Sequence, residues 1–208
     1  MNETEDYLKH ISEIKTLMER SNRFLSLSGI SGVIAGVYAL AGAGVAWWLM
    51  DYYDKPAFLS RFTSRPDGDL LFWLAVDGFV VLLLAVTTGI LLTAARSRAN
   101  GQKIWDNTSK RLFINLAIPL VAGGILCIIY LSRGYIGVLA PLTLVFYGLA
   151  LVNGSKYTLS DIRSLGLLEI GLGILAAIFV GYGLLFWALG FGVLHIAYGL
   201  YMHYKYER

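Results

Sequence analysis

Six long apolar stretches constrain this 208-residue chain more than any other feature. They cover residues 24–50, 70–95, 112–132, 134–153, 165–182 and 184–204. Away from the ends of these stretches, the only Asp, Glu, His, Lys or Arg residues are Asp77, Glu169 and His195. About 20 apolar residues in a helix cross the ~30 Å hydrocarbon core of a bilayer, and a helix satisfies its own backbone hydrogen bonds there. The sequence therefore predicts an all-α integral membrane protein with six transmembrane helices.

The composition agrees with a membrane protein and disfavours other classes. Hydrophobic residues make up 57% of the chain, charged residues 15%, and the mean hydropathy is +0.63. Soluble domains have about a quarter charged residues. The net charge of +3 comes from Lys and Arg near the ends of the spans, so we expect the lipid bilayer, and no nucleic acid, as a partner. The single cysteine, Cys127, excludes an intrachain disulfide.

The six stretches also group into three similar helical hairpins. The second span of each ends in a related way, with a Gly-containing apolar run shortly before a basic residue: Thr88–Leu92 before Arg96, Tyr147–Leu151 before Lys156, and Tyr198–Met202 before Lys205. Three copies that run in the same in–out direction are parallel repeats, unlike the inverted repeats of many transporters. We therefore expect one hairpin repeated three times.

Glycines recur within the first span of each hairpin. Small residues let helix backbones approach closely in lipid, where no hydrophobic effect drives helices together. The candidate helix-packing residues are Gly32, Gly36, Gly124 and Gly173.

The distribution of basic residues predicts the orientation, because cytoplasmic loops carry an excess of Lys and Arg. Thirteen fall on one side: Lys9, Lys15, Arg20, Arg23, Arg96, Arg98, Lys103, Lys110, Arg111, Lys156, Arg163, Lys205 and Arg208. Four fall on the other: Lys55, Arg61, Arg65 and Arg133. We expect a multi-pass protein of the cytoplasmic (inner) membrane with both termini in the cytoplasm.

The chain divides into residues 1–23 and a six-helix domain over residues 24–206. Within residues 3–22, Leu8, Ile11 and Ile14 recur at helical spacing, which predicts an amphipathic helix on the cytoplasmic side. Its apolar face either packs on the membrane surface and inner loops or binds a protein partner or a second copy of the chain.

Asp77, Glu169 and His195 are the candidate functional residues, because an ionisable group at membrane depth costs several kcal/mol unless it is paired. None of the three recurs in the other hairpins. Glu169 and His195 belong to one hairpin, so they form the preferred pair, and an acid beside a histidine makes a proton-responsive site. Each residue can instead be a structural group bonded to a backbone carbonyl.

Catalytic and metal-binding patterns are missing from the sequence. It contains no HExxH, GxSxG, CxxC or phosphate-binding loop. His195 and His203 are eight residues apart, so along one helix they lie about 12 Å apart and cannot share a metal. We expect no metal site and no cofactor, and an enzyme is the least favoured class.

The last two spans resemble a known family. The run from Leu165 to Ala176 and the run from Leu184 to Leu200 are similar to the Gly-punctuated hairpins of bacterial HdeD-like membrane proteins. The resemblance implies six spans, hairpin repetition and an association with acid resistance, and it supplies no site residues.

Two functional hypotheses follow. The first is a small transport or conductance protein, or a pH-responsive membrane protein, in which Asp77, Glu169 and His195 line a polar interior. The alternative is a non-catalytic membrane scaffold that binds a partner through residues 3–22.

Overall fold

The computed structural model describes residues 10, 28–53, 68–99 and 105–207, and nearly all of them are helical. The first five long helices are α2 (Gly29–Tyr52), α3 (Gly68–Ala99), α4 (Asn107–Ser132), α5 (Leu139–Gly154) and α6 (Asp161–Ile178). A short 3₁₀ turn, η2 (Ser155–Tyr157), follows α5. The last helix is continuous but changes type along its length, from α7 (Gly183–Trp187) through the π-helical segment η3 (Ala188–Leu194) to α8 (His195–Tyr206). The predicted amphipathic helix over residues 3–22 lies outside the described residues, apart from His10.

Four of these helices are long and apolar enough to cross a membrane: Gly29–Tyr52, Gly68–Ala99, Asn107–Ser132 and Gly183–Tyr206. The other two helices, α5 and α6, do not meet these limits of length and composition. Helix α5 has only 16 residues, and α6 carries Asp161, Arg163 and Glu169 among its 18 residues. Large apolar side chains cover the outer surface of the molecule, including Phe79, which is 64% exposed on α3. An apolar surface of this extent suits lipid rather than water, so the structure agrees with an all-α membrane protein.

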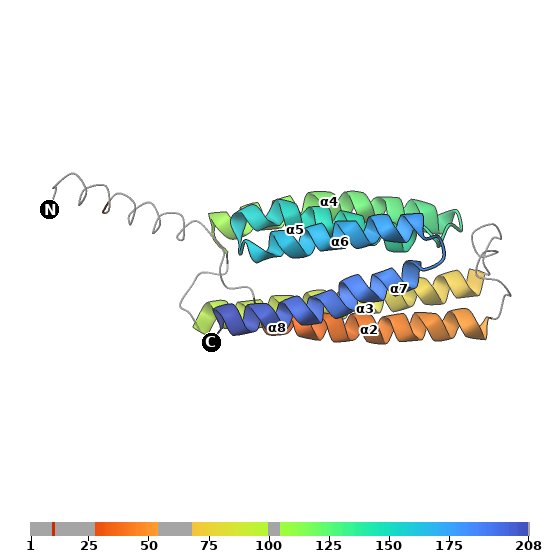
Figure 1. Ribbon diagram of the computed structural model, residues 1–208, viewed down its shortest axis with the longest axis horizontal. Coiled ribbons are helices and arrows are strands. Elements are labelled where there is room, and N and C mark those ends of the chain that lie inside the picture. Colours follow the sequence, from red (N-terminus) through yellow and green to blue (C-terminus); the bar gives the residue numbers. More distant parts are fainter. Residues whose placement is uncertain (1–9, 11–27, 54–67, 100–104, 208) are drawn as a thin grey trace.

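The helices lie in two layers (Figure 1). One layer holds α4, α5 and α6, and the other holds α2, α3 and the last helix. Helix α8 packs along α2, whereas α6 packs along α5. The last helix approaches α6 mainly through α7 and η3, near the turn that joins them. Helix α6 and the last helix therefore do not pack along each other as α2 packs on α3 and α4 on α5.

Glycines lie where helix backbones approach most closely. A Cβ added to Gly36 of α2 would lie 2.7 Å from the carbonyl oxygen of Gly192, and one added to Gly32 would lie 3.4 Å from the Cα of Gly199. In the other layer, a Cβ on Gly173 of α6 would lie 3.0 Å from the backbone nitrogen of Val145. Three of the four glycines selected from the sequence thus lie at helix–helix contacts.

The fourth glycine, Gly124, is a correction. It is exposed, and a Cβ placed there would meet nothing within 4 Å among the residues that the structure describes. Its neighbour Gly123 makes the contact instead, because a Cβ at that position would lie 2.5 Å from the Cβ of Phe146 on α5. Adjacent residues on a helix point about 100° apart, so only one of the two glycines can face α5.

The turn between α4 and α5 places the start of α5 later than the sequence suggested. Gly134 has a φ of 82°, its N–H donates to the Leu131 carbonyl, and the N–H of Tyr135 donates to the Tyr130 carbonyl. These bonds form the Schellman cap that commonly ends a helix at a glycine. Helix α5 therefore begins at Leu139 rather than near residue 134.

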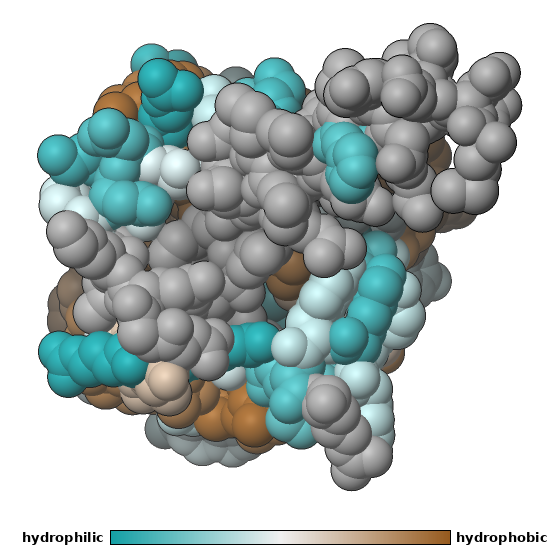
Figure 2. Space-filling model, turned by 90° about the vertical axis from the view of Figure 1, so that its left-hand side faces the viewer, coloured by the Kyte–Doolittle hydropathy of each residue, from teal (hydrophilic) through white to brown (hydrophobic). Residues whose placement is uncertain are grey.

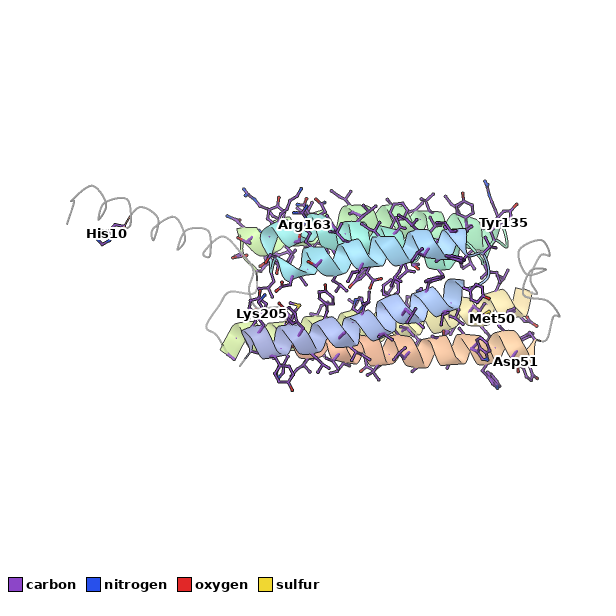
Figure 3. The ribbon with its side chains drawn as sticks, viewed as in Figure 1. His10, Met50, Asp51, Tyr135, Arg163 and Lys205 are labelled. Carbon is purple, nitrogen blue, oxygen red and sulfur yellow. The ribbon has the colours of Figure 1, made fainter. Side chains whose placement is uncertain are left out.

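Polar residues gather at one end of the molecule. Arg163 and Lys205 lie at one end, and Met50, Asp51 and Tyr135 lie at the other (Figure 3). Hydrophilic side chains gather on the end that holds Arg163 and Lys205 (Figure 2). At this end Asp161 of α6 accepts hydrogen bonds from the Lys205 ammonium at 2.8 Å and the Tyr206 hydroxyl at 2.7 Å. This acid therefore ties the start of α6 to the end of α8, across the two layers.

Candidate functional site

Glu169 lies on the buried face of α6. Its side chain is completely buried, with 0% exposure. Gly166, three residues before it, and Gly173, four residues after it, both face α5, because such spacing places them on one side of the helix. The close α5–α6 packing made possible by these glycines thus holds the carboxyl group inside the protein.

His195 begins α8 directly after the π-helical segment η3, and 7% of the residue is exposed. Its Nδ1 lies 3.0 Å from the Gly190 carbonyl oxygen and 3.4 Å from Oε1 of Glu169. The structure thus brings together the two residues that the sequence paired. π-helical turns are rare and often lie at functional sites.

Gly190 makes room for the glutamate. A Cβ at this position would lie 2.5 Å from Oε2 of Glu169, so a larger residue would collide with the carboxyl group. The Gly190 carbonyl oxygen also accepts from the histidine ring. One glycine therefore serves both members of the pair, through its missing side chain and through its backbone.

Tyr147 of α5 completes the site. Its hydroxyl lies 2.8 Å from Nε2 of His195, and the two rings have centroids 5.4 Å apart. Phe191 lies beside both rings, with centroid distances of 5.0 Å to Tyr147 and 5.8 Å to His195. The site therefore joins α5, α6 and the last helix, and it bridges the two layers of the fold.

The Glu169 carboxyl group has no hydrogen-bond partner for either oxygen within the described ranges. Isolated burial of an ionised carboxylate is very costly, so the group must be neutral or have a cation close to it. The imidazole of His195, 3.4 Å away, is placed to be that cation when it is protonated. The arrangement can therefore hold a proton in either of two places, on the carboxyl group or on the ring.

Asp77 lies elsewhere. It is on α3 and faces α2, where both carboxylate oxygens are 3.6 Å from the position of a Cβ built on Gly42. It is partly exposed, and no contact described here joins it to Glu169 or His195. The expected interior lined by all three residues thus reduces to a pair, with Asp77 apart from it.

No cluster of three or more His, Cys, Asp or Glu residues suited to a metal ion occurs in residues 28–53, 68–99 and 105–207.

Sequence reasoning missed Tyr147 and Gly190. Tyr147 had a usable signal, because a buried tyrosine hydroxyl in an apolar span needs a polar partner and His195 is one of few available. No sequence signal identified Gly190, because it is one of 23 glycines and nothing in the sequence indicates a π-helical turn around it.

No protein-family model, curated protein or solved structure matches this chain. The similarity of residues 165–200 to HdeD-like proteins thus stays an interpretation of the sequence.

Proposed function

We propose that the chain crosses the cytoplasmic membrane six times, with both ends in the cytoplasm. Four helices meet the length and composition of a crossing. Helices α5 and α6, with 16 and 18 residues, extend roughly 24–27 Å, close to the ~30 Å of the hydrocarbon core. The basic residues Arg163 and Lys205 lie together at one end of the bundle, and this supports the assignment of that end to the cytoplasm.

We propose further that the protein is a small proton-linked transport or conductance protein, or a pH-responsive membrane protein, with Glu169 and His195 as its proton-binding site. The observation that carries this proposal is the Glu169 carboxyl group, which is fully buried, has no hydrogen-bond partner among the described residues and lies 3.4 Å from Nδ1 of His195. A structural carboxyl group would be expected to have hydrogen bonds that satisfy it. Ionisable groups at membrane depth are otherwise rare and commonly mark proton or ion pathways.

The pair can exist in two states that differ in charge. With a carboxylate and a neutral ring, the site has one net negative charge, and one added proton neutralises it. That proton resides either on Glu169, beside a neutral ring, or on His195, as an ion pair with the carboxylate. A change of charge at a junction of three helices alters their packing energy, and this links proton binding to a change in the bundle.

Proton flux in sealed liposomes tests this proposal. The purified protein is reconstituted with a pH-sensitive dye inside, and the rate of internal pH change is measured after an external pH step. We expect Glu169→Gln and His195→Gln each to reduce the protein-dependent rate about tenfold or more, because positioned proton-transfer groups contribute ~10²–10⁴ in rate.

The matched control is Asp77→Asn, which neutralises an intramembrane acid outside the pair. We expect it to retain most of the wild-type rate. Unaltered flux in both the Glu169 and the His195 variants would overturn the proposal.

A further inference from the structure

The hydrogen bonds of His195 define which ring nitrogen carries the proton. A backbone carbonyl oxygen can only accept, so the 3.0 Å contact between Nδ1 and the Gly190 oxygen requires a hydrogen on Nδ1. In the neutral ring Nε2 then has a free lone pair. Tyr147, whose hydroxyl lies 2.8 Å from Nε2, must therefore donate its hydrogen to this nitrogen.

This tautomer determines the side from which a further proton reaches the ring. Nδ1 faces Glu169 and already bears a hydrogen, so the carboxyl group cannot protonate the neutral ring directly. The free lone pair on Nε2 faces Tyr147. Among the described residues, the Tyr147 hydroxyl is the group hydrogen-bonded to Nε2. A proton that reaches Nε2 along hydrogen bonds therefore passes through the tyrosine.

We propose that Tyr147 is the proton relay that connects this site with its surroundings, and that His195 passes the proton on to Glu169. This inference rests on the proposed function. In the loading step a hydronium ion transfers a proton to the Tyr147 oxygen and becomes water, while the original tyrosine hydrogen moves to Nε2. The Nδ1 hydrogen then moves to Oε1 of Glu169, 3.4 Å away. One proton enters, the carboxylate becomes a neutral carboxyl group, and the ring stays neutral with its hydrogen on Nε2.

The groups that contact His195 in the described residues come from four helices. Helix α2 presents Gly32 to His195, where a Cβ would lie 3.6 Å from the histidine carbonyl oxygen. The last helix adds Phe191, helix α5 adds Tyr147, and helix α6 adds Glu169. Among the described residues, a proton that approaches Nε2 thus has the tyrosine hydroxyl as its hydrogen-bonded donor.

The variant Tyr147→Phe tests the relay, because it keeps the ring beside Phe191 and removes only the hydroxyl. We expect proton flux in the liposome assay to fall about tenfold or more. The control is Tyr135→Phe, which removes an exposed hydroxyl from the α4–α5 turn at the end of the molecule and should leave the flux unchanged. Wild-type flux in Tyr147→Phe, together with a strong loss in Glu169→Gln, would overturn the relay and leave the proposed function intact. Unchanged flux in Glu169→Gln and His195→Gln would overturn the proposed function itself.

A second measurement does not depend on flux. Nitrogen-15 NMR of the histidines in the wild-type protein distinguishes the two tautomers of His195, with His195→Gln to assign its signal. At alkaline pH, where Glu169 is a carboxylate, we expect the neutral ring to carry its hydrogen on Nδ1, and we expect the Nε2 resonance to shift in Tyr147→Phe. A ring with its hydrogen on Nε2 at alkaline pH, or an Nε2 resonance unaffected by loss of the hydroxyl, would overturn the relay.

Discussion

The Glu207 carboxylate, just after α8, accepts a hydrogen bond of 2.5 Å from the backbone N–H of Gly29, at the start of α2 and 178 residues earlier in the chain. The same carboxylate pairs with Arg96 of α3 and accepts from Nδ1 of His203 at 2.5 Å. Glu207 therefore joins the ends of all three helices of one layer. The N-terminal end of a helix also favours a nearby negative charge, which adds to the bond with Gly29.

Neutralising this carboxylate should loosen the layer. Glu207→Gln keeps a side chain of similar size but loses the charge-assisted bonds, so we expect the protein to be less stable by about 1–2 kcal/mol. For a protein of this size, that lowers the apparent unfolding midpoint by roughly 2–8 °C. Thermal unfolding in detergent measures the change, with Asp51→Asn, an exposed acid at the opposite end, as the control. Equal midpoints for Glu207→Gln and Asp51→Asn would contradict this role.

The same cluster should make stability depend on pH. Partial burial alone would raise the pKa of Glu207, but hydrogen bonds from His203 and Gly29 and the charge of Arg96 outweigh it and hold that pKa below its usual range. Because the pKa is lowered on folding, the contribution of Glu207 is complete above the usual glutamate pKa of about 4.3 and is lost as the pH falls towards the folded value. Unfolding midpoints measured from neutral to acidic pH should therefore fall more steeply for the wild type than for Glu207→Gln. If the midpoints of both proteins fall equally with pH, Glu207 does not make this pH-dependent contribution.

The two adjacent glycines of α4 provide a paired test of the packing. A Cβ on Gly123 would collide with Phe146, whereas one on Gly124 meets nothing described. We expect Gly123→Ala to destabilise the protein by about 1–3 kcal/mol through overpacking. Gly124→Ala should be neutral or stabilising by up to ~1 kcal/mol, because alanine favours a helix. If both variants unfold at the same temperature, α4 does not meet α5 through this face.

Cysteine labelling tests the six-span topology. In a Cys127→Ser background, a membrane-impermeant maleimide applied to intact cells should label Arg133→Cys, in the α4–α5 turn, which the proposed topology places outside. It should label Lys156→Cys, after α5, only once the membrane is opened. Both positions are exposed in the structure, so access to the thiol reports the side of the membrane. Labelling of Lys156→Cys in intact cells would reverse the proposed orientation or remove a span.

The hydropathy of the sequence predicted the positions of most helices. The free-energy cost of a polar group in lipid depends on the residue type alone, so it can be read without knowing which residues are in contact. The same reasoning led to Glu169 and His195, since an unpaired ionisable group at that depth requires a neighbour. For α5 it placed the start too early, because Gly134 and the turn after it are as apolar as a helix and hydropathy does not register the positive φ.

Helix partners were harder to predict. Lipid-facing and protein-facing surfaces are both apolar, so no hydrophobic contrast indicates that α8 packs on α2 rather than on α6. To choose between Gly123 and Gly124, one must know which face of α4 meets α5. Leu116 lies on that face, against Gly154 of α5, and Gly123 follows it by seven residues, which is about two turns. Gly124 points about 100° away from that face. The π-helical turn before His195 shifts the phase of the last helix, and periodicity drawn from regular α-helices cannot reveal it.

The most direct test of the account is whether Glu169 exchanges a proton. Infrared difference spectroscopy of the protein in lipid, recorded between acidic and alkaline pH, detects the carbonyl stretch of a carboxyl group as it gains or loses its proton. We predict a carboxyl band that disappears in Glu169→Gln, persists in Asp77→Asn and changes frequency in His195→Gln. A spectrum of Glu169→Gln identical to that of the wild type would contradict the central claim that this buried carboxyl group binds the proton.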